Sequence, residues 1–260
     1  MGKLDGKVAA ITGSTRSIGR AMAEAFLREG ASVVVNGRDQ AKGEQAIAEM
    51  GGGDRLALFV GDAAKQSTAE GIVDYAVERF GKLDIMCLNS GGVQHTAPVA
   101  EMSDEEWQLE MDWNLNSVFW GMRRSLQHMI PRNSGRIIVT SSVEGKGAKP
   151  GIPGYNTTKH AVCGLVKSAA KEVGTTGITV NALLPGLIET DIVRDTGPES
   201  AKMMGLDSYE AMIDMFAQES AIKKPNTVEQ VAAVAVLLAS DAGRNMTACM
   251  FPIDGGTLPY

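Results

Sequence analysis

Residues 142–159 read SVEGKGAKPGIPGYNTTK, a loop rich in glycine and proline that leads into a segment with helical spacing. Apolar residues continue this spacing at Val162 and Val166, so we expect a helix to open at Tyr155. Tyr155 and Lys159 are four residues apart and therefore share one face of that helix. An ammonium group beside a phenol stabilises the phenolate and lowers the phenol's pKa, and each unit of lowering requires about 1.4 kcal/mol of stabilisation. Such a shift would make Tyr155 a general acid/base at neutral pH. On these two residues alone, an ordinary surface helix is the simpler interpretation.

The composition indicates a globular protein without a nucleic-acid or membrane partner. The chain has 260 residues, 44% of them hydrophobic, and a net charge of −6 without a long run of one sign. Its cysteines and histidines are scattered, so we expect neither a metal site nor a structural disulfide. Because no apolar run has transmembrane length and no signal peptide is recognisable, we expect a cytoplasmic protein.

Short apolar runs alternate with helical patterns along the whole chain. The predicted strands are residues 8–12, 33–35, 56–60, 85–88, 136–140, 179–184 and 248–253. This alternation predicts an α/β fold, a single Rossmann-like domain over residues 1–260 with a doubly wound parallel sheet and helices on both faces. Ligands of such sheets bind beyond the carboxyl ends of the strands, where the sequence places polar or glycine-bearing turns.

The first of these turns, Gly13–Gly19, lies between a strand and a helix. Free N–H groups at a helix N-terminus favour phosphate, so the turn is a candidate anion site. Its spacing is G-x-x-x-S-x-G and not the commonest dinucleotide fingerprint, so a purely structural turn is the alternative.

Two further segments suggest partners or substrate. The helix predicted over residues 104–130 has apolar residues on two faces, which is typical of a helix that packs on a second body such as another subunit. Residues 191–222 form a methionine-rich insertion that interrupts the alternation. We expect a substrate lid that covers an adaptable apolar pocket; a structural insertion that packs against another subunit is the alternative.

In this order and spacing, the motifs resemble those of the short-chain dehydrogenase/reductase family over nearly the whole chain. The matching elements are Thr12-Gly13-x-x-x-Ser17-Ile18-Gly19, Leu88-Asn89-Ser90-Gly91, Trp113-Asn114-Leu115, Ser142, Tyr155-x-x-x-Lys159, Pro185-Gly186 with Thr190, and Asp254-Gly255-Gly256. Three positions depart from the family pattern: Ser17 and Ala248 replace glycines, and Leu88 replaces an asparagine that ties neighbouring strands together.

The resemblance implies an oxidoreductase that transfers hydride between a nicotinamide and a carbonyl/secondary alcohol pair. It assigns catalytic roles to Asn114, Ser142, Tyr155 and Lys159: Tyr155 as general acid/base, Lys159 to lower its pKa and bind the ribose, Ser142 to bind the substrate oxygen, and Asn114 to hold a relay water. It assigns cofactor contacts to Gly13, Ser14, Arg16, Ser17, Ile18, Gly19, Arg38, Asp62, Ala63, Asn89, Gly91, Tyr155, Lys159, Pro185, Gly186, Ile188 and Thr190. It also implies a homotetramer built on the helices that contain Trp113 and Tyr155.

The residues after the second strand bear on the choice of cofactor. Gly37 stands where relatives that prefer NAD keep an aspartate, and Arg38 suits a 2′-phosphate, with Arg16 as a second cation. Asp39 argues the other way, because it could neutralise Arg38. We therefore expect NADP(H), with NAD(H) as the alternative.

The substrate is expected to be a medium-sized, largely apolar ketone or alcohol. Gln94, His95 and Glu144 flank matched positions, so each is either a pocket residue or a polar surface residue. The rival function is a redox-inactive nucleotide-binding or regulatory protein of the same fold.

Overall fold

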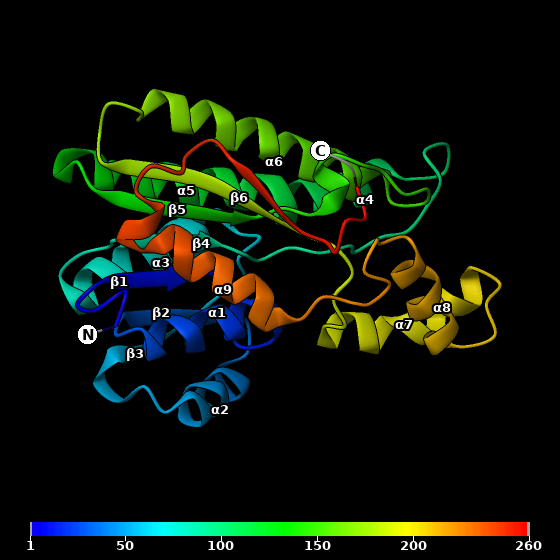
Figure 1. Cartoon of the computed structure of the whole chain (residues 1–260), viewed down its shortest axis with the longest axis horizontal. Coiled ribbons are helices and arrows are strands. Elements are labelled where there is room, and N and C mark those ends of the chain that lie inside the picture. Colours follow the sequence, from blue (N-terminus) through cyan, green and yellow to red (C-terminus); the bar gives the residue numbers. More distant parts are fainter. Residues whose placement is uncertain (1, 259–260) are drawn as a thin grey trace.

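The computed structural model describes residues 2–258, apart from the side chains of Thr196 and Met203, and it contains one seven-stranded sheet (Figure 1). The strands lie in the order β3-β2-β1-β4-β5-β6-β7, and all neighbouring pairs are parallel. Their bounds are β1 Val8–Ile11, β2 Ser32–Gly37, β3 Leu56–Val60, β4 Ile85–Leu88, β5 Gly135–Thr140, β6 Ile178–Pro185 and β7 Met250–Ile253. The predicted doubly wound parallel sheet is confirmed, and the order of strands reverses between β1 and β4.

The helices of the described chain cover both faces of this sheet. They are α1 Ser17–Arg28, α2 Gln40–Met50, α3 Gln66–Phe80, α4 Asp104–Met111, α5 Ser117–Met129, α6 Pro153–Glu172, α7 Asp191–Met203, α8 Tyr209–Gln218 and α9 Val228–Ala239. One apolar cluster joins the sheet to α1 and α9, and another joins its opposite face to α3, α5 and α6. Because both faces are covered, the central strands are apolar on both sides, as Val33, Val34 and Val35 illustrate.

The segment predicted as one helix over residues 104–130 consists of three parts. Helix α4 begins at a capping box in which Ser103 and Glu106 each bond the other's backbone. A π-helical turn over Asp112–Asn116 then separates α4 from α5. The predicted helix is present, and it contains a π-helical turn that the sequence did not indicate.

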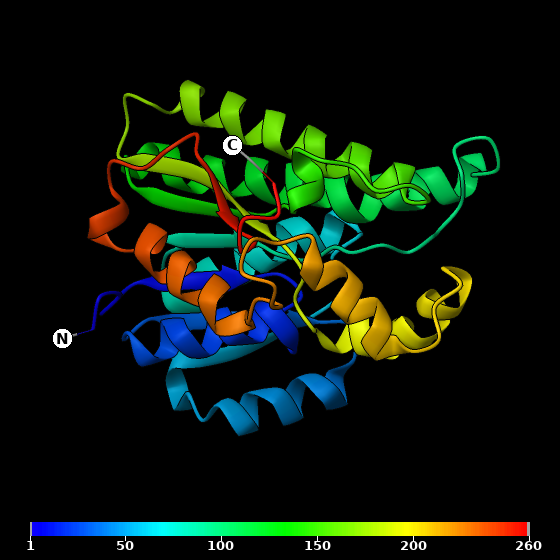
Figure 2. The same ribbon diagram turned by 45° about the vertical axis from the view of Figure 1, so that its right-hand side comes forward.

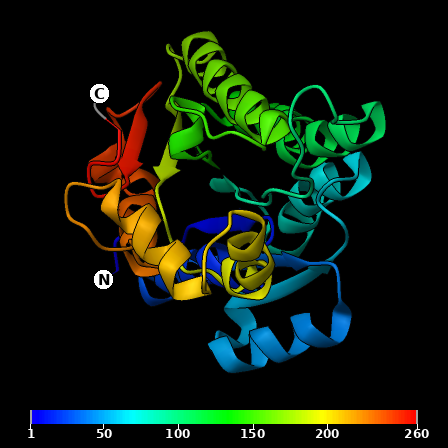
Figure 3. The same cartoon turned by 90° about the vertical axis from the view of Figure 1, so that its right-hand side faces the viewer.

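The insertion at residues 191–222 forms two helices, α7 and α8, whereas the sequence suggested only a break in the alternation. The pair lies beyond the carboxyl ends of the strands (Figures 1 and 2) and faces the viewer in Figure 3. A small apolar cluster of its own, with Ala201, Met212 and Ile213 buried, holds the two helices together. Among the helices of the described chain, none is both long and apolar enough for a membrane span.

Candidate active site

The turn between β1 and α1 is held from three sides. Gly13 N donates to Asn36 Oδ1 at 3.1 Å, and Ser14 N donates to the carbonyl of Asn36 at 2.8 Å. The carboxamide of Asn36 also donates to the carbonyls of Phe59 and Gly61, so this one residue connects the turn to β2 and β3. At Gly19, an added β-carbon would lie 2.3 Å from the carbonyl oxygen of Gly13, so only glycine permits the approach of α1 to the turn.

Ser17 stands in this turn with a φ of 52°, a left-handed conformation that glycine adopts without strain. Its hydroxyl donates to Asp191 Oδ2, and Arg16 Nη1 lies 3.7 Å from Asp195 Oδ2. Arg16 therefore points toward α7, and Ile18 packs against the core. A pocket of about 380 Å³ opens here between the start of α1, the segment 189–194 and the start of α9.

The carboxyl end of β4 brings the next predicted residues beside the turn. Asn89 Nδ2 donates to the carbonyls of Thr12 and Gly13, and its Oδ1 accepts from Thr140 Oγ1 at 3.0 Å. Asn89 thus ties β1, β4 and β5 together, although Leu88 replaces the neighbouring asparagine of the family pattern. Leu88 itself is buried.

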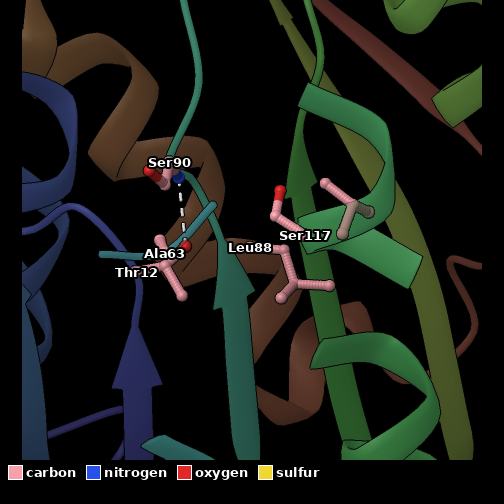
Figure 4. A pocket seen from close by; sticks show the side chains of 6 residues that line it. Thr12, Ala63, Leu88, Ser90 and Ser117 are labelled. Atoms are coloured by element: carbon pink, nitrogen blue, oxygen red, sulfur yellow. Dashed lines mark hydrogen bonds between the residues drawn. The ribbon is translucent and has the colours of Figure 1, made fainter. Parts of the chain in front are cut away.

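A small pocket lies below this strand end (Figure 4), where Ser90 N donates to Thr12 Oγ1. It is lined by Thr12, Ala63, Leu88, Ser90, Ser117 and Val118. Asp62, one residue before Ala63, accepts from Ala64 N at 3.1 Å. The predicted residues Asp62 and Ala63 therefore stand close to the end of β4.

Asn114 lies on the π-helical turn and is completely buried. Its Oδ1 accepts from Gly92 N at 2.9 Å and its Nδ2 donates to the carbonyl of Gly92 at 2.9 Å. At Gly91, an added β-carbon would lie 2.7 Å from Asn114 Oδ1 and 3.3 Å from Lys159 Nζ. Asn114 and Lys159 therefore both lie against the loop after β4 at Gly91.

Lys159 and Tyr155 share the inner face of α6. Lys159 is buried, its Nζ donates to the carbonyl of Thr140 at 3.0 Å, and it lies 5.3 Å from the centroid of the Tyr155 ring. Burial lowers the pKa of Lys159 to about 8, although the neighbouring Cys163, Glu110 and Glu144 raise it in part.

The predicted lowering of the pKa of Tyr155 by Lys159 is wrong in this arrangement. Burial raises the pKa of Tyr155, the neighbouring hydroxyl of Ser142 opposes that shift, and the carboxylates of Glu144 and Glu110 add to it. Desolvation and two nearby anions thus keep Tyr155 as a neutral phenol.

Ser142 follows β5 and is buried beside Tyr155. Its hydroxyl donates to Glu144 Oε2, and Glu144 N donates to Ser142 Oγ at 3.2 Å. Glu144 therefore contacts a candidate catalytic residue directly.

The last predicted cofactor segment leaves β6. Pro185 ends this strand, and Gly186 N donates to the carbonyl of Ile253 at 2.9 Å. Ile188 is buried in the core, and Thr190 caps α7 by accepting from Val193 N. Arg38, by contrast, is exposed directly after β2 and belongs to a different turn from Arg16.

Sequence reasoning missed two residues of this site, Asn36 and Glu110. Glu110 has no exposed surface, and its carboxylate bonds Asn114 and the backbone of Gln94 and His95. A signal for Glu110 existed, because a carboxylate four residues before Asn114 falls on the inward face of the helix. Asn36 lay at the end of an apolar strand, and its four hydrogen-bond partners come from segments distant in sequence.

Comparison with known proteins identifies the family. The family model described as short chain dehydrogenase matches residues 7–201. The D-beta-hydroxybutyrate dehydrogenase of Cupriavidus necator is 34% identical over 256 residues, which cover 97% of this chain and 98% of that protein. The 3beta-hydroxysteroid dehydrogenase 2 of Eggerthella lenta is 34% identical over 261 residues, covering 99% and 96%.

A solved structure agrees with these relatives. A single-residue variant of the actinorhodin polyketide ketoreductase with NADPH superimposes with a TM-score of 0.93 at 28% identity, and the match covers 100% of both chains. The chain therefore belongs to the short-chain dehydrogenase/reductase family and is an oxidoreductase that uses a nicotinamide cofactor.

Proposed function

We propose that this enzyme transfers hydride between NADP(H) and a ketone/secondary alcohol pair, with Tyr155 as the general acid/base. The observation that carries the proposal is the meeting of four groups at the ends of β4 and β5. Asn114 and Lys159 both lie against Gly91, while Ser142 is a buried neighbour of Tyr155.

The residues present fit a dinucleotide. The turn from Gly13 to Gly19 leads into the N-terminus of α1, and its glycine contacts bring the backbone close enough to cradle a pyrophosphate. A bound nicotinamide would supply or accept the hydride, and the chain's own residues would handle the proton.

Tyr155 would donate that proton to the substrate oxygen. The raised pKa of Tyr155 keeps the phenol protonated at neutral pH, which is the form that an acid catalyst requires. Lys159, largely charged below its pKa of about 8, would place a positive charge behind the phenol as the proton leaves.

The substrate is proposed to be a medium-sized hydroxy or keto compound with a largely apolar body. The two relatives are named for hydroxybutyrate and a hydroxysteroid, so molecules of very different size are used within the family. Met204, directly after α7, and Met215 on α8 are exposed, and they would form an adaptable apolar surface over the substrate. We propose that α7 and α8 act as the lid.

Three observations favour NADP(H) over NAD(H). An added β-carbon at Gly37 would lie 2.6 Å from Thr15 Cγ2, so an aspartate would not fit there without displacing Thr15. Arg38 is exposed next to that position. Asp39, the residue that could neutralise Arg38, accepts a hydrogen bond from Lys42 N as the N-cap of α2.

Steady-state kinetics with both cofactors test this preference. Arg38→Ala should raise KM for NADPH about tenfold to a hundredfold, the value of one hydrogen-bonded charge, and leave KM for NADH unchanged. Equal efficiency of the wild type with NADH would contradict the preference.

We propose a homotetramer as the assembled form. Large apolar side chains are exposed along α4 and α5, with Trp107 38% and Phe119 43% exposed, and Leu165 is half-buried on the outer face of α6. Light scattering tests this, and a monomer at micromolar concentration would contradict it.

The reaction itself is tested by following absorbance of the reduced nicotinamide with a panel of ketones and alcohols. Tyr155→Phe should lower kcat by about a hundredfold to ten-thousandfold and keep cofactor binding. Cofactor binding without turnover of any substrate by the wild type would favour the redox-inactive alternative. Turnover by Tyr155→Phe close to the wild-type value would refute the role of Tyr155.

A further inference from the structure

Glu110 is a buried carboxylate that the proposed proton transfer does not use. It is the last residue but one of α4, it has no exposed surface, and three neighbours hydrogen-bond its side chain. Its Oε1 accepts from Gln94 N at 2.7 Å and from His95 N at 3.0 Å, and its Oε2 accepts from Asn114 Nδ2 at 2.8 Å. A buried charge is costly unless it is paired in this way, so a role beyond packing needs to be considered.

These hydrogen bonds connect three parts of the site. The amides of Gln94 and His95 belong to the loop that follows β4, and Asn114 belongs to the π-helical turn. Asn114 also bonds Gly92 of the same loop in both directions, so Glu110, Asn114 and the loop form one closed network. Without the carboxylate, Asn114 would keep its bonds to Gly92 in this network, and the amides of Gln94 and His95 would lose their acceptor.

Glu110 also packs against the start of α6. An added β-carbon at Gly154, the residue before Tyr155, would lie 2.9 Å from Glu110 Cγ. Its negative charge acts on Tyr155 and on Lys159, together with that of Glu144 and with Cys163 on α6. Glu110 is thus coupled by contact to Asn114 and by charge to Tyr155 and Lys159.

We propose that Glu110 is a positioning residue, whose carboxylate holds Asn114 and the loop of residues 92–95 in the arrangement needed for turnover. The inference rests on the proposed hydride transfer. The carboxylate oxygens accept hydrogen bonds from all three donors at once, a task that a neutral amide cannot perform in the same geometry.

Glu110→Gln tests this directly. The single oxygen of glutamine can still accept from Gln94 N and His95 N, but its amide nitrogen then meets Asn114 Nδ2, donor against donor. Asn114 cannot turn over to avoid this, because Gly92 holds both of its polar atoms. We expect kcat to fall about tenfold to a hundredfold, the effect of one unsatisfied buried group.

The pattern of effects separates positioning from mere structural support. The glycine-bearing turn does not contact Glu110, so stoichiometric cofactor binding should persist with a Kd within about twofold of the wild type. Turnover is expressed per cofactor-binding site, so that a loss of folded protein alone leaves kcat unchanged. Removal of one of the carboxylates that raise the pKa of Lys159 should also move the alkaline limb of the pH–rate profile to lower pH.

Glu105→Gln is the matched control, because Glu105 is exposed on the same helix and should behave as the wild type. Glu110→Asp keeps the charge but shortens the reach by one methylene, so we expect a lower kcat with an unmoved alkaline limb. This second variant decides the question if Glu110→Gln fails to bind cofactor stoichiometrically.

If the wild type is active and Glu110→Gln has the same kcat per cofactor site, the inference is overturned. If Glu110→Gln does not fold, the same kcat in Glu110→Asp overturns it. A wild type without turnover on the whole substrate panel is a different result, because it overturns the proposed function and the inference with it.

Discussion

The hydroxyl of Ser17 donates a hydrogen bond of 2.9 Å to the carboxylate of Asp191, which joins the turn after β1 to the first residue of α7. Arg16 and Asp195 face each other across the same boundary. Two carboxylates of α7 therefore lie against the turn where the cofactor phosphates are proposed to bind, and they would compete with those phosphates for the same groups.

Asp191→Asn should accordingly bind NADP(H) more tightly. We expect Kd to fall about twofold to fivefold, since an exposed charge interaction is worth roughly 0.2–1 kcal/mol. A fluorescence titration measures this, and the difference should shrink as salt is added. Asp214→Asn, which changes an exposed carboxylate on α8, serves as the control. Weaker binding by Asp191→Asn would mean that the contact between Ser17 and Asp191 supports the bound state.

Glu144→Ala should speed carbonyl reduction. Ser142 has one hydroxyl proton, which it gives to Glu144, so it cannot donate to Glu144 and to a substrate oxygen at once. We expect kcat for a ketone to rise about tenfold, the value of one hydrogen bond to a charged partner. The alkaline limb should also move to lower pH, because Glu144 is one of the groups that raise the pKa of Lys159.

Steady-state rates across pH, with Glu101→Ala as an exposed control, check this expectation. A fall in kcat would show instead that Glu144 holds Ser142 in its productive orientation.

The stability of the enzyme should depend on pH through Lys159. Its pKa is about 8 in the folded chain against about 10.5 when unfolded, so between these values the unfolded state binds more protons. The free energy of unfolding contributed by this group therefore rises from pH 8 to pH 10.5, by at most about 3 kcal/mol at 1.4 kcal/mol per pH unit.

Urea unfolding of the wild type and of Lys159→Met measures this contribution. The variant should gain most relative to the wild type below pH 8, where the buried ammonium is charged, and this gain should shrink as the pH rises through 8 to 10. A difference between the two proteins that is constant from pH 7 to pH 10 would contradict the lowered pKa of Lys159.

Ala248→Gly should stabilise the fold. Ala248 has a φ of 59°, a conformation that costs an L-residue roughly 1–2 kcal/mol and glycine almost nothing. The greater freedom of glycine in the unfolded chain offsets part of this gain, so we expect a net increase of about 0.5–1 kcal/mol.

Thermal unfolding should then show a Tm about 2–4 °C higher for each kcal/mol gained. Ala41→Gly, at an exposed position of α2, is the control and should lower Tm. A lower Tm for Ala248→Gly would indicate that the lost methyl group contributes more through packing than the strained backbone costs.

The sheet could be predicted because its signals are local. Runs such as Val33–Val35 are apolar on both faces, and the turns that follow the strands contain glycine or asparagine. The capping box of α4 could be predicted for the same reason, because Ser103 and Glu106 are only three residues apart. Helices α7 and α8 also had local signals, since Thr190 and Ser208 cap them, but these lay within a segment that we interpreted as a break.

The chemistry of the site was less accessible, because it depends on groups that are distant in sequence. The expectation for Tyr155 considered only Lys159, whereas burial and the charges of Glu144 and Glu110 determine the direction of its pKa shift. The π-helical turn has no glycine or proline to announce it. Within this turn, Asn114 forms hydrogen bonds with Gly92, which belongs to the distant loop after β4.

That π-helical turn allows one change in the sequence to affect the position of Asn114 without affecting the packing of α5 on the sheet. A π-turn contains one residue more than an α-helical turn, so deletion of a single residue between 112 and 116 would let α4 and α5 continue as one regular helix. The side chains on either side of the deletion would then change their relative orientation by about 100°. Asn114 would lose its alignment with Gly92, while the apolar contacts of α5 with the sheet involve Val118 and Met122 further along. With Asn114 in its proposed catalytic role, such a deletion would remove catalysis and leave the nucleotide-binding scaffold in place. Alignments of relatives should therefore be inspected for gaps at this turn before activity is assigned to them.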